Sequence, residues 1–445
     1  MKKVNRREFI KTSAAVAAGV SLLPSGIILG RDDRKVRLGF IGVGLRGTSH
    51  LELALARKDV EVKAVCDIRK AATDNAVKLV TDAGQKKPAV YLNGEEDYRN
   101  LVTREDIDGV IISTPWVWHA PMAIAAMKAG KYAGVEVPAA LTEEECWDLV
   151  HTSEETGMPC MILENVCYRR DVMAVYNMVR QGIFGELMHC HCGYQHDLRN
   201  IKFQPGAEFG EKGQGEAVWR TEHSIKRNGD LYPTHGAGPV AKMLDINTGN
   251  RFVTLTSMAT KSRGLHNYVL AQGGEDHPNA KIKFALGDIV TTMIKCANGE
   301  TVLISHDTNL PRPYSLNFRV QGTNGLWMDD FDSIYLEGVS PEPHRWESFE
   351  KYQEQYDHPL WKKYESDSEG AGHGGMDFFV LHAFIESIKR KVPTPIDVYD
   401  AAAWSVIVPL SEQSVAQGGA PMAIPDFTGG RWVWRKSDFA LDDQY

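Results

Sequence analysis

A glycine-rich turn beginning at residue 42 constrains the fold of this chain more than any other segment. Gly42, Gly44 and Gly47 are spaced as G-x-G-x-x-G between an apolar run at residues 36–41 and a helix-like stretch at residues 48–57. The first glycine permits a tight turn, the second lets the backbone approach a pyrophosphate, and the third allows close helix packing. The helix N-terminus favours the phosphate charge. The segment therefore predicts a dinucleotide-binding Rossmann domain.

An acidic residue follows the second predicted strand. Residues 61–66 alternate as a strand and are followed by Asp67, twenty residues after Gly47. A carboxylate at this place accepts hydrogen bonds from the ribose hydroxyls and repels a 2′-phosphate. We therefore expect NAD as the cofactor, in preference to NADP.

Strand and helix patterns continue to alternate up to residue 165. Further strands are predicted at residues 108–113, 132–138 and 159–165, and further helices at 120–130 and after Thr142, which begins a capping box. Ligands of parallel α/β sheets bind beyond the carboxyl ends of the strands.

Four residues follow these strand ends: Trp116, His119, Glu136 and Asn165. We expect them near the ligand, and for each of them a purely local structural role stays open.

The second half predicts a different architecture. The predicted strands lie at residues 187–193, 252–258, 281–286, 289–296, 301–305 and 316–321. The predicted helices lie at 171–181, 237–244, 377–391 and 398–417. This pattern predicts an α+β domain with an open, largely antiparallel sheet, one face packed on helices and the other toward the cofactor. We therefore expect a Rossmann domain at residues 34–165 and a second domain at 166–445, and whether its C-terminal segment packs back on the first domain is open.

The first thirty residues have the composition of an export signal. Asn5-Arg6-Arg7-Glu8-Phe9-Ile10-Lys11 resembles the twin-arginine motif, and a short apolar run with small residues follows it. We expect residues 1–30 to direct the folded protein to the periplasm, or otherwise out of the cytoplasm. The cleavage site stays open.

Composition excludes several classes of protein. The net charge is −8 and no Lys/Arg-rich run is present, so no nucleic-acid partner is expected. No apolar stretch is long enough to span a membrane. Residues 189–192 read His-Cys-His-Cys, but alternate strand residues point to opposite faces, so we expect no metal site.

The first half resembles the Gfo/Idh/MocA oxidoreductase superfamily. The likeness covers residues 42–165 and includes the T-P-x-x-x-H run that ends at His119 and the strand that ends at Glu136. Sugar dehydrogenases of that superfamily have Glu-Lys-Pro at this strand, and the lysine transfers a proton. This chain has Val137 in its place, which argues against a simple sugar dehydrogenase.

Over nearly its whole length after residue 30, the chain resembles glycoside hydrolase family 109, the NAD-dependent α-N-acetylgalactosaminidases. The shared motifs include GVGLRG, ENVCYRRDVMA, GYQHDLR, LYPTHG, HPNAK, GAGHGGMD and IPDF. The resemblance implies hydrolysis of terminal α-N-acetylgalactosamine from glycoconjugates. In the family, the sugar is oxidised at C3 by tightly bound NAD, loses its C2 proton, expels the aglycone, adds water at C1 and is reduced again, so the cofactor is recycled.

The resemblance also implies roles for individual residues. His235 and Tyr232 are the candidates for proton transfer at C3, and Tyr194 for the C2 proton, with a phenol acting as base where its pKa is lowered. Arg220 and Tyr314, with Tyr194 and Tyr232, are expected to bind the sugar. The expected cofactor contacts are Gly42, Gly44, Leu45, Arg46, Gly47, Asp67, Trp116, His119, Glu136, Val137 and Asn165.

Two other functions remain alternatives: an NAD-dependent sugar oxidoreductase and a non-catalytic periplasmic sugar-binding protein. The sequence leaves open the aglycone, the preference for galacto or gluco sugars, the base at C2 and whether the chain forms a homo-oligomer.

Overall fold

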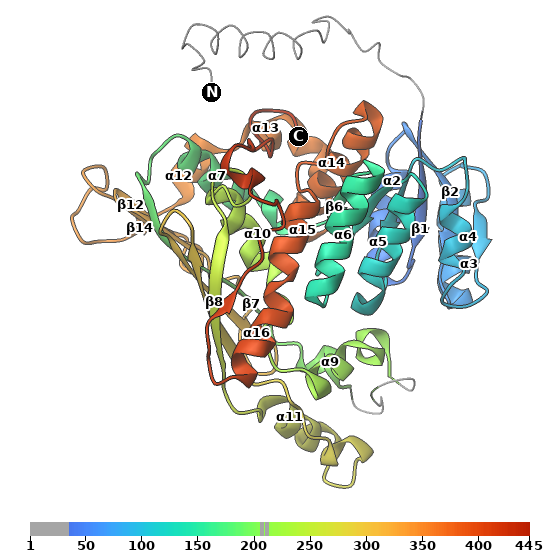
Figure 1. Cartoon of the computed structure of the whole chain (residues 1–445), viewed down its shortest axis with the longest axis horizontal. Helices are drawn as coiled ribbons and strands as arrows, with labels where there is room; N and C mark the ends of the chain where they lie inside the picture. The colour runs from blue at the N-terminus through green and yellow to red at the C-terminus, as the bar shows by residue number, and fades with distance from the viewer. Residues whose placement is uncertain (1–34, 205–208, 210–212) are drawn as a thin grey trace, which may run out of the picture. The chain divides into compact units, whose positions relative to one another are not determined.

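A computed structural model describes residues 35–204, 209 and 213–445, so the predicted export signal lies outside the described residues. The first part is a six-stranded parallel sheet in the order β3-β2-β1-β4-β5-β6 (Figure 1). Its strands are β1 (Val36–Ile41), β2 (Val60–Cys66), β3 (Ala89–Tyr91), β4 (Gly109–Ile112), β5 (Tyr132–Val135) and β6 (Cys160–Ile162). This is the strand order of dinucleotide-binding folds, and it confirms the predicted doubly wound sheet.

Helices connect the strands of this sheet. They are α2 (Leu45–Leu55), α3 (Lys70–Asp82), α4 (Tyr98–Val102), α5 (His119–Lys128) and α6 (Glu143–Thr156). The predicted capping box is present, because the Thr142 hydroxyl accepts from the N–H of Glu145 and the Glu145 carboxylate accepts from the N–H of Thr142. Helix α2 begins three residues before the predicted start, inside the glycine motif.

The second sheet has nine strands in the order β14-β13-β12-β11-β7-β10-β9-β8-β15. All its pairs are antiparallel except β7 with β10, so the largely antiparallel prediction is confirmed. The longer strands are β7 (Leu187–Gln195), β8 (Phe252–Ala259), β9 (Ile289–Cys296) and β10 (Thr301–Asp307). The shorter strands are β11 (Arg319–Gly322), β12 (Gly325–Met328), β13 (Ser333–Leu336), β14 (Glu347–Ser348) and β15 (Met422–Ala423).

Helices of the second half pack on this sheet and on the first one. They are α7 (Arg170–Arg180), α8 (Arg199–Lys202), α9 (Arg220–Lys226), α10 (Thr234–Met243), α11 (Gly264–Gly273), α12 (Glu350–Tyr356), α13 (Pro359–Ser368), α14 (Met376–Arg390), α15 (Val398–Ser405) and α16 (Ile407–Ala416). Helix α15 lies beside α6, and α16 lies against β8 (Figure 1).

Two predictions of secondary structure were wrong. Residues 281–286 form no strand: the N–H groups of Ala285 and Leu286 bond to carbonyls of α9 residues, and Phe284 packs in a separate apolar cluster. The single helix predicted at 398–417 is two helices, because Pro409 has no N–H to donate to the carbonyl of Ser405, where α15 ends.

The prediction for the two faces of the second sheet also needs correction. Cys190, Cys192 and Tyr194 alternate on the buried face of β7, which α10 covers. A Cβ on Gly236 of α10 would lie 2.5 Å from the backbone nitrogen of Gly193. The face that α10 covers is therefore also the face from which Tyr194 points toward the first domain. The other face carries half-buried side chains.

Two glycines of the first sheet make room for a helix from the second half. A Cβ on Gly109 would lie 2.6 Å from Cδ1 of Ile388, and a Cβ on Gly134 would lie 3.1 Å from Cζ of Phe384. Both partners are in the middle and later turns of α14, which therefore packs against the first sheet.

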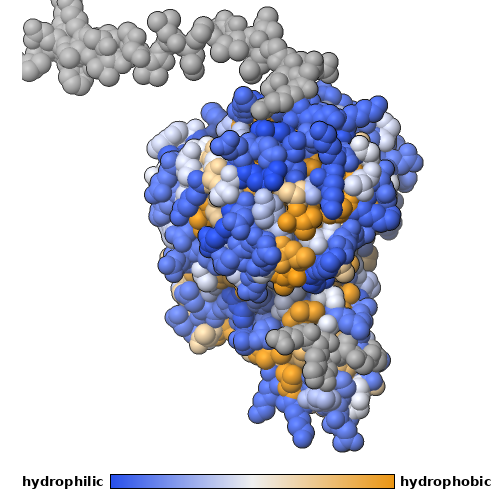
Figure 2. Space-filling model, turned by 90° about the vertical axis from the view of Figure 1, so that its right-hand side faces the viewer, coloured by the Kyte–Doolittle hydropathy of each residue, from blue (hydrophilic) through white to orange (hydrophobic). Residues whose placement is uncertain are grey.

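Most of the buried apolar side chains of the two parts belong to one continuous core, beside two smaller clusters. Seen from the side of the first sheet, the surface is mostly hydrophilic with smaller apolar patches (Figure 2). Among the described residues, no helix is long and apolar enough to cross a membrane.

Candidate active site

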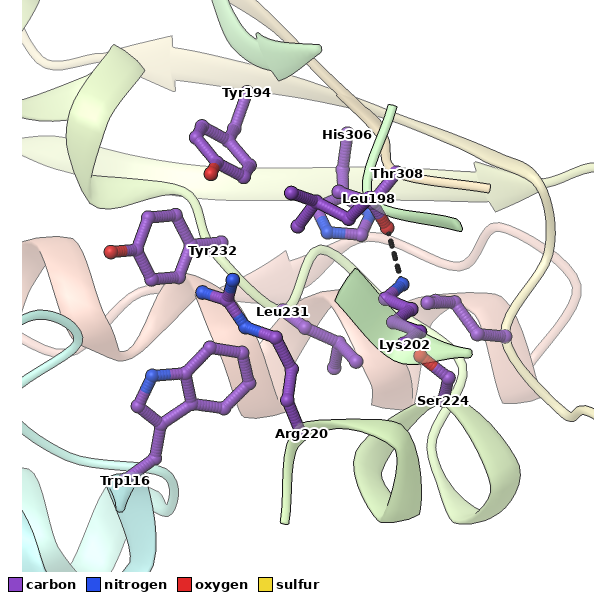
Figure 3. Close-up of a pocket in the computed structure, with 11 residues that line it drawn as sticks. Trp116, Tyr194, Leu198, Lys202, Arg220, Ser224, Leu231, Tyr232, His306 and Thr308 are labelled. Atoms are coloured by element: carbon purple, nitrogen blue, oxygen red, sulfur yellow. Dashed lines mark hydrogen bonds between the residues drawn. The ribbon is translucent and has the colours of Figure 1, made fainter. Parts of the chain in front are cut away.

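A cavity lies where the carboxyl end of β4 in the first sheet faces the ends of β7 and β10 in the second. Trp116 lines it from the segment after β4, and most of the other lining residues come from α9, the segment before α10, the end of β7 with the following α8, and the end of β10 (Figure 3). Its lining residues are Trp116, Tyr194, Leu198, Lys202, Arg220, Ser224, Leu231, Tyr232, Leu286, His306 and Thr308. It therefore brings together four residues predicted from the sequence: Trp116, Tyr194, Arg220 and Tyr232.

The glycine loop has the shape that a pyrophosphate requires. Gly42 has φ +80°, a conformation that side-chain-bearing residues rarely adopt. A Cβ on Gly47 would lie 1.9 Å from the carbonyl oxygen of Gly42, so the helix cannot approach the turn with any larger residue. Leu45 at the start of α2 is 73% exposed. These residues fit a dinucleotide at the N-terminus of α2.

Asp67 lies at the end of β2 and faces the same loop. Its Oδ2 accepts from the backbone N–H of Val43 at 3.0 Å, and its Oδ1 accepts from the N–H of Arg69 at 2.9 Å. Oδ1 also accepts from Arg69 Nε at 3.4 Å, whereas Oδ2 retains a second lone pair for a ribose hydroxyl. The geometry thus accommodates the predicted ribose contact while using Asp67 to hold the loop.

Arg46 and Glu136, both predicted cofactor contacts, form an ion pair. Arg46 Nε donates to Glu136 Oε1 at 2.6 Å, and His50 Nε2 lies 2.6 Å from the same oxygen. Burial raises the pKa of Glu136, but Arg46 and His50 outweigh it and hold the pKa far below its usual range. Glu136 is therefore ionised, and Val137 beside it is buried and apolar.

Asn165 follows β6 and bonds to a residue from the second half. Its Nδ2 donates to Oδ1 of Asp377 at 2.6 Å, while its own Oδ1 is buried without a partner among the described residues. A buried oxygen without a hydrogen-bond donor costs folding free energy, and a ligand that donates to Asn165 Oδ1 would remove this cost. This observation also fits a bound dinucleotide.

His235 is paired with a fully buried carboxylate. Its Nδ1 lies 2.7 Å from Oε1 and 2.9 Å from Oε2 of Glu164, which is 0% exposed. A neutral imidazole in this pair carries its proton on Nδ1, so Nε2 is left as the acceptor. His235 can therefore take up and return a proton in a fixed orientation.

Two tyrosines stand beside this pair. The ring centroids of Tyr194 and Tyr232 are 4.6 Å apart, and those of Tyr232 and His235 are 4.9 Å apart. Burial raises the pKa of both phenols, most strongly for Tyr232. The lowered pKa expected for a phenol acting as base is therefore absent in the protein by itself.

Arg220 is the cation next to the phenols. Its guanidinium lies 5.2 Å from the ring centroid of Tyr232 and 5.0 Å from that of Trp116, and its Nη1 pairs with Glu216 at 2.6 Å. Its positive charge opposes the effect of burial on the pKa of Tyr194. Tyr314 stands at the edge, 50% exposed, with its ring 6.4 Å from that of Tyr194.

The far end of the cavity carries a buried lysine (Figure 3). Lys202 Nζ donates to Thr308 Oγ1 and to Asn309 Oδ1, both at 2.8 Å. Burial lowers the pKa of Lys202 to about 7. His306 lies next to it, and burial, with the charges of Lys202 and Arg220, lowers the pKa of His306 to about 3.

His119 differs in position from the other predicted cofactor contacts. It is buried, with Nδ1 2.7 Å from the carbonyl oxygen of Pro138 and Nε2 2.8 Å from that of Thr114. The ring thus connects the loops after β4 and β5.

Among the described residues, no group of three or more His, Cys, Asp or Glu side chains could hold a metal ion.

Four residues of the site were not predicted from the sequence: Glu164, His50, Asp377 and Lys202. Glu164 directly precedes Asn165 at the end of a predicted strand, so its position was a usable signal. Asp377 ends the GAGHGGMD motif, but nothing in the motif indicated its role, and His50 and Lys202 had no signal, because the partners of all three are distant in sequence. His373, also absent from the predicted site residues, has its Nδ1 2.7 Å from Oδ2 of Asp377.

Comparisons with known proteins agree with this architecture. A model of the oxidoreductase family with an NAD-binding Rossmann fold matches residues 36–163, and a model of the C-terminal domain of glycosyl hydrolase 109 matches residues 168–434. Among solved structures, a levoglucosan dehydrogenase in complex with NADH and levoglucosan has a TM-score of 0.66 at 20% identity, covering 88% of this chain and 100% of that one. That likeness concerns the fold.

Two curated relatives are much more similar. A glycosyl hydrolase family 109 protein of Stenotrophomonas maltophilia (strain K279a) is 55% identical over 457 residues, covering 100% of both chains. An alpha-N-acetylgalactosaminidase of Tannerella forsythia is 55% identical over 423 residues, covering 93% of this chain and 90% of the relative.

Proposed function

The chain belongs to glycoside hydrolase family 109, and from this premise we propose that it hydrolyses terminal α-N-acetylgalactosamine from glycoconjugates by transient oxidation at C3. The observation that carries the proposal is the Glu164–His235 pair with Tyr194 and Tyr232 beside it. This cluster supplies proton-transfer groups, whereas Val137 occupies the place of the dehydrogenase lysine.

Bound NAD⁺ supplies reversible acceptance of a hydride at C3 of the sugar. His235, oriented by Glu164, takes the proton of the C3 hydroxyl through Nε2 while that carbon is oxidised. The resulting C3 ketone makes the C2 hydrogen acidic.

Tyr194 or Tyr232, as the phenolate, removes the C2 hydrogen as a proton, and the electron pair of that bond expels the aglycone, which leaves C1 with the electrons of its own bond. Water then adds at C1: its hydroxyl bonds to that carbon, its remaining proton goes to the oxygen of the departed aglycone, and the phenol returns a proton to C2. As C3 is reduced again, His235 returns a proton to the C3 oxygen. Because burial raises the pKa of the phenols, the base needs nearby positive charge, and Arg220 provides part of it.

Tight retention of the cofactor follows from this cycle, since the hydride returns at the end of each turnover. No second substrate is needed to regenerate NAD⁺. The protein should therefore act on a glycoside without added cofactor, which an ordinary sugar oxidoreductase cannot sustain.

The test is hydrolysis of p-nitrophenyl α-N-acetylgalactosaminide in D₂O without added NAD⁺. Nitrophenol release with deuterium at C2 of the product supports the proposal. Release without C2 deuterium contradicts the redox route. Accumulation of NADH with free sugars favours the sugar oxidoreductase, and absence of any turnover favours the sugar-binding protein. His235→Gln is the informative variant, and His151→Gln, on the exposed side of α6, is its control.

We further propose that the folded protein is exported by the twin-arginine route. Arg6 and Arg7 precede a short apolar run, and a recycled cofactor suits an enzyme that carries NAD with it. A double variant with lysine at both positions should remain in the cytoplasm, while Lys2→Arg should not change export. Equal export of the double variant would contradict the proposal.

A further inference from the structure

The carboxylate of Asp377 is the convergence point of three segments. It lies in the first turn of α14 and is 0% exposed. Its Oδ2 accepts from Arg46 Nη1 at 2.7 Å and from His373 Nδ1 at 2.7 Å, and its Oδ1 accepts from Asn165 Nδ2 at 2.6 Å. One buried side chain thus joins the glycine loop, the turn after β6 and the turn before α14.

Two of these donors belong to the nucleotide-binding half. Arg46 lies within the G-x-G-x-x-G motif, and Asn165 follows β6 at the carboxyl edge of the sheet, where dinucleotides bind. The buried Oδ1 of Asn165 has no partner among the described residues, so fixing its Nδ2 aims that oxygen at a ligand. Asp377 itself comes from the second half of the chain.

The charge balance shows why a carboxylate is needed here. Arg46 is shared between Glu136 and Asp377, with its Nε on the first and its Nη1 on the second. A neutral amide at residue 377 would leave the guanidinium held by Glu136 alone. It would also turn one carboxylate oxygen into an NH₂ group that faces donors.

The turn before α14 is shaped around this carboxylate. A Cβ on Gly372 would lie 2.5 Å from Asp377 Oδ2. His373 has φ +53°, which side-chain-bearing residues other than Asn, Asp and His rarely adopt, and in this conformation its Nδ1 lies 2.7 Å from Asp377 Oδ2. Hydrogen bonding to Asp377 raises the pKa of His373, so the bond is strongest when His373 is protonated.

We propose that Asp377 is a positioning residue for the dinucleotide, which holds Arg46 and Asn165 in their binding orientation and thereby links cofactor retention to the docking of α14. The proposal rests on the proposed use of NAD. Asp377 contacts other side chains and acts through them.

The experiment measures the Kd of NAD⁺ by calorimetry on full-length protein stripped of cofactor. Asp377→Asn should weaken NAD⁺ binding at least tenfold, and its glycosidase activity should disappear on dialysis and return with excess NAD⁺. A Kd within twofold of the unmodified protein would overturn the proposal. The matched control is Glu386→Gln on the same helix, which removes an ion pair with Arg57 and should lower thermal stability without changing the Kd.

A second variant protects the test against misfolding of the first. The His373 side chain is 61% exposed, so His373→Gln should fold, and it should weaken NAD⁺ binding severalfold at pH 6 and less at pH 8. An unchanged Kd at both pH values would overturn the proposal. If the unmodified protein binds NAD⁺ but does not hydrolyse glycosides, the proposed function fails while the Kd comparison still decides the role of Asp377.

Discussion

The Nδ1 atom of His235 lies 2.7 Å from Oε1 of Glu164, and this carboxylate also accepts from the backbone N–H of Val166 at 3.1 Å. The carboxylate is thus held from one side by the η3 turn (Asn165–Tyr168) and holds the imidazole on the other. The Glu164 side chain is fully buried, whereas that of His235 is 16% exposed. The relationship makes Glu164 the residue that determines which nitrogen of His235 faces the site.

Glu164→Gln should lower kcat by about 10²-fold or more, because an amide NH₂ facing Nδ1 favours the tautomer that carries its proton on Nε2. The remaining amide oxygen can still accept from Val166, so the fold should persist. Steady-state kinetics with thermal unfolding provide the measurement. Glu145→Gln in the capping box is the matched control and should leave kcat unchanged. Equal kinetics for both variants would rule out the orienting role.

The proton transfer at C3 should depend on His235, and the proton transfer at C2 should depend on Tyr194. With His235→Gln, mixing enzyme and glycoside should produce no absorbance of reduced nicotinamide. With Tyr194→Phe, reduction should still occur in the first turnover, while nitrophenol release and deuterium incorporation at C2 should fall. Stopped-flow absorbance with product analysis checks this. Normal C2 exchange in Tyr194→Phe would transfer the base role to Tyr232.

Gly47→Ala should abolish NAD⁺ binding, since its Cβ would lie 1.9 Å from the Gly42 carbonyl oxygen and would push α2 away from the loop. Gly157→Ala is the comparison, because Gly157 has φ +68° but no atom within 4 Å of the added Cβ. That variant should lose only about 1–2 kcal/mol of folding stability, the cost of alanine in a left-handed conformation, and should keep its cofactor. Calorimetry and urea unfolding measure both effects. Undiminished NAD⁺ binding by Gly47→Ala would contradict the glycine-loop argument.

Asp230→Asn should stabilise the protein at pH 8 but not at pH 4. Burial raises the pKa of Asp230 from 3.8 to about 7, so the folded state binds more protons than the unfolded state between these values. Stability from this group is therefore complete below pH 4 and is lost as the pH rises toward 7, by about 2–4 kcal/mol. Asparagine retains the acceptor for the N–H of Tyr232 without this loss. Urea unfolding of the unmodified protein and of Asp230→Asn at both pH values tests this prediction, and the exposed Asp74→Asn is the control. A stability difference that is the same at both pH values would contradict it.

Local sequence patterns determined much of this protein. The glycine spacing, the acid after β2 and the strand–helix alternation predicted the first sheet, because each pattern reports interactions between neighbours along the chain. The capping box at Thr142 and Glu145 is predictable for the same reason. The prediction at residues 281–286 was wrong because alternation reports one buried side of a segment but does not identify its partner.

Only the tertiary structure determined which side chains meet. Glu164 and His235 are 71 residues apart, and Arg46 and Asp377 are 331 residues apart, so no local pattern relates them. Their contacts depend on α10 lying over β7 and on α14 lying against Gly109 and Gly134 of the first sheet. The sequence by itself determined the nucleotide-binding sheet and its glycine loop. The packing of distant helices decided how the Glu164–His235 pair and the contacts of Asp377 are assembled. The reason is that buried charges are stabilised by partners that only the folded chain brings within hydrogen-bonding distance.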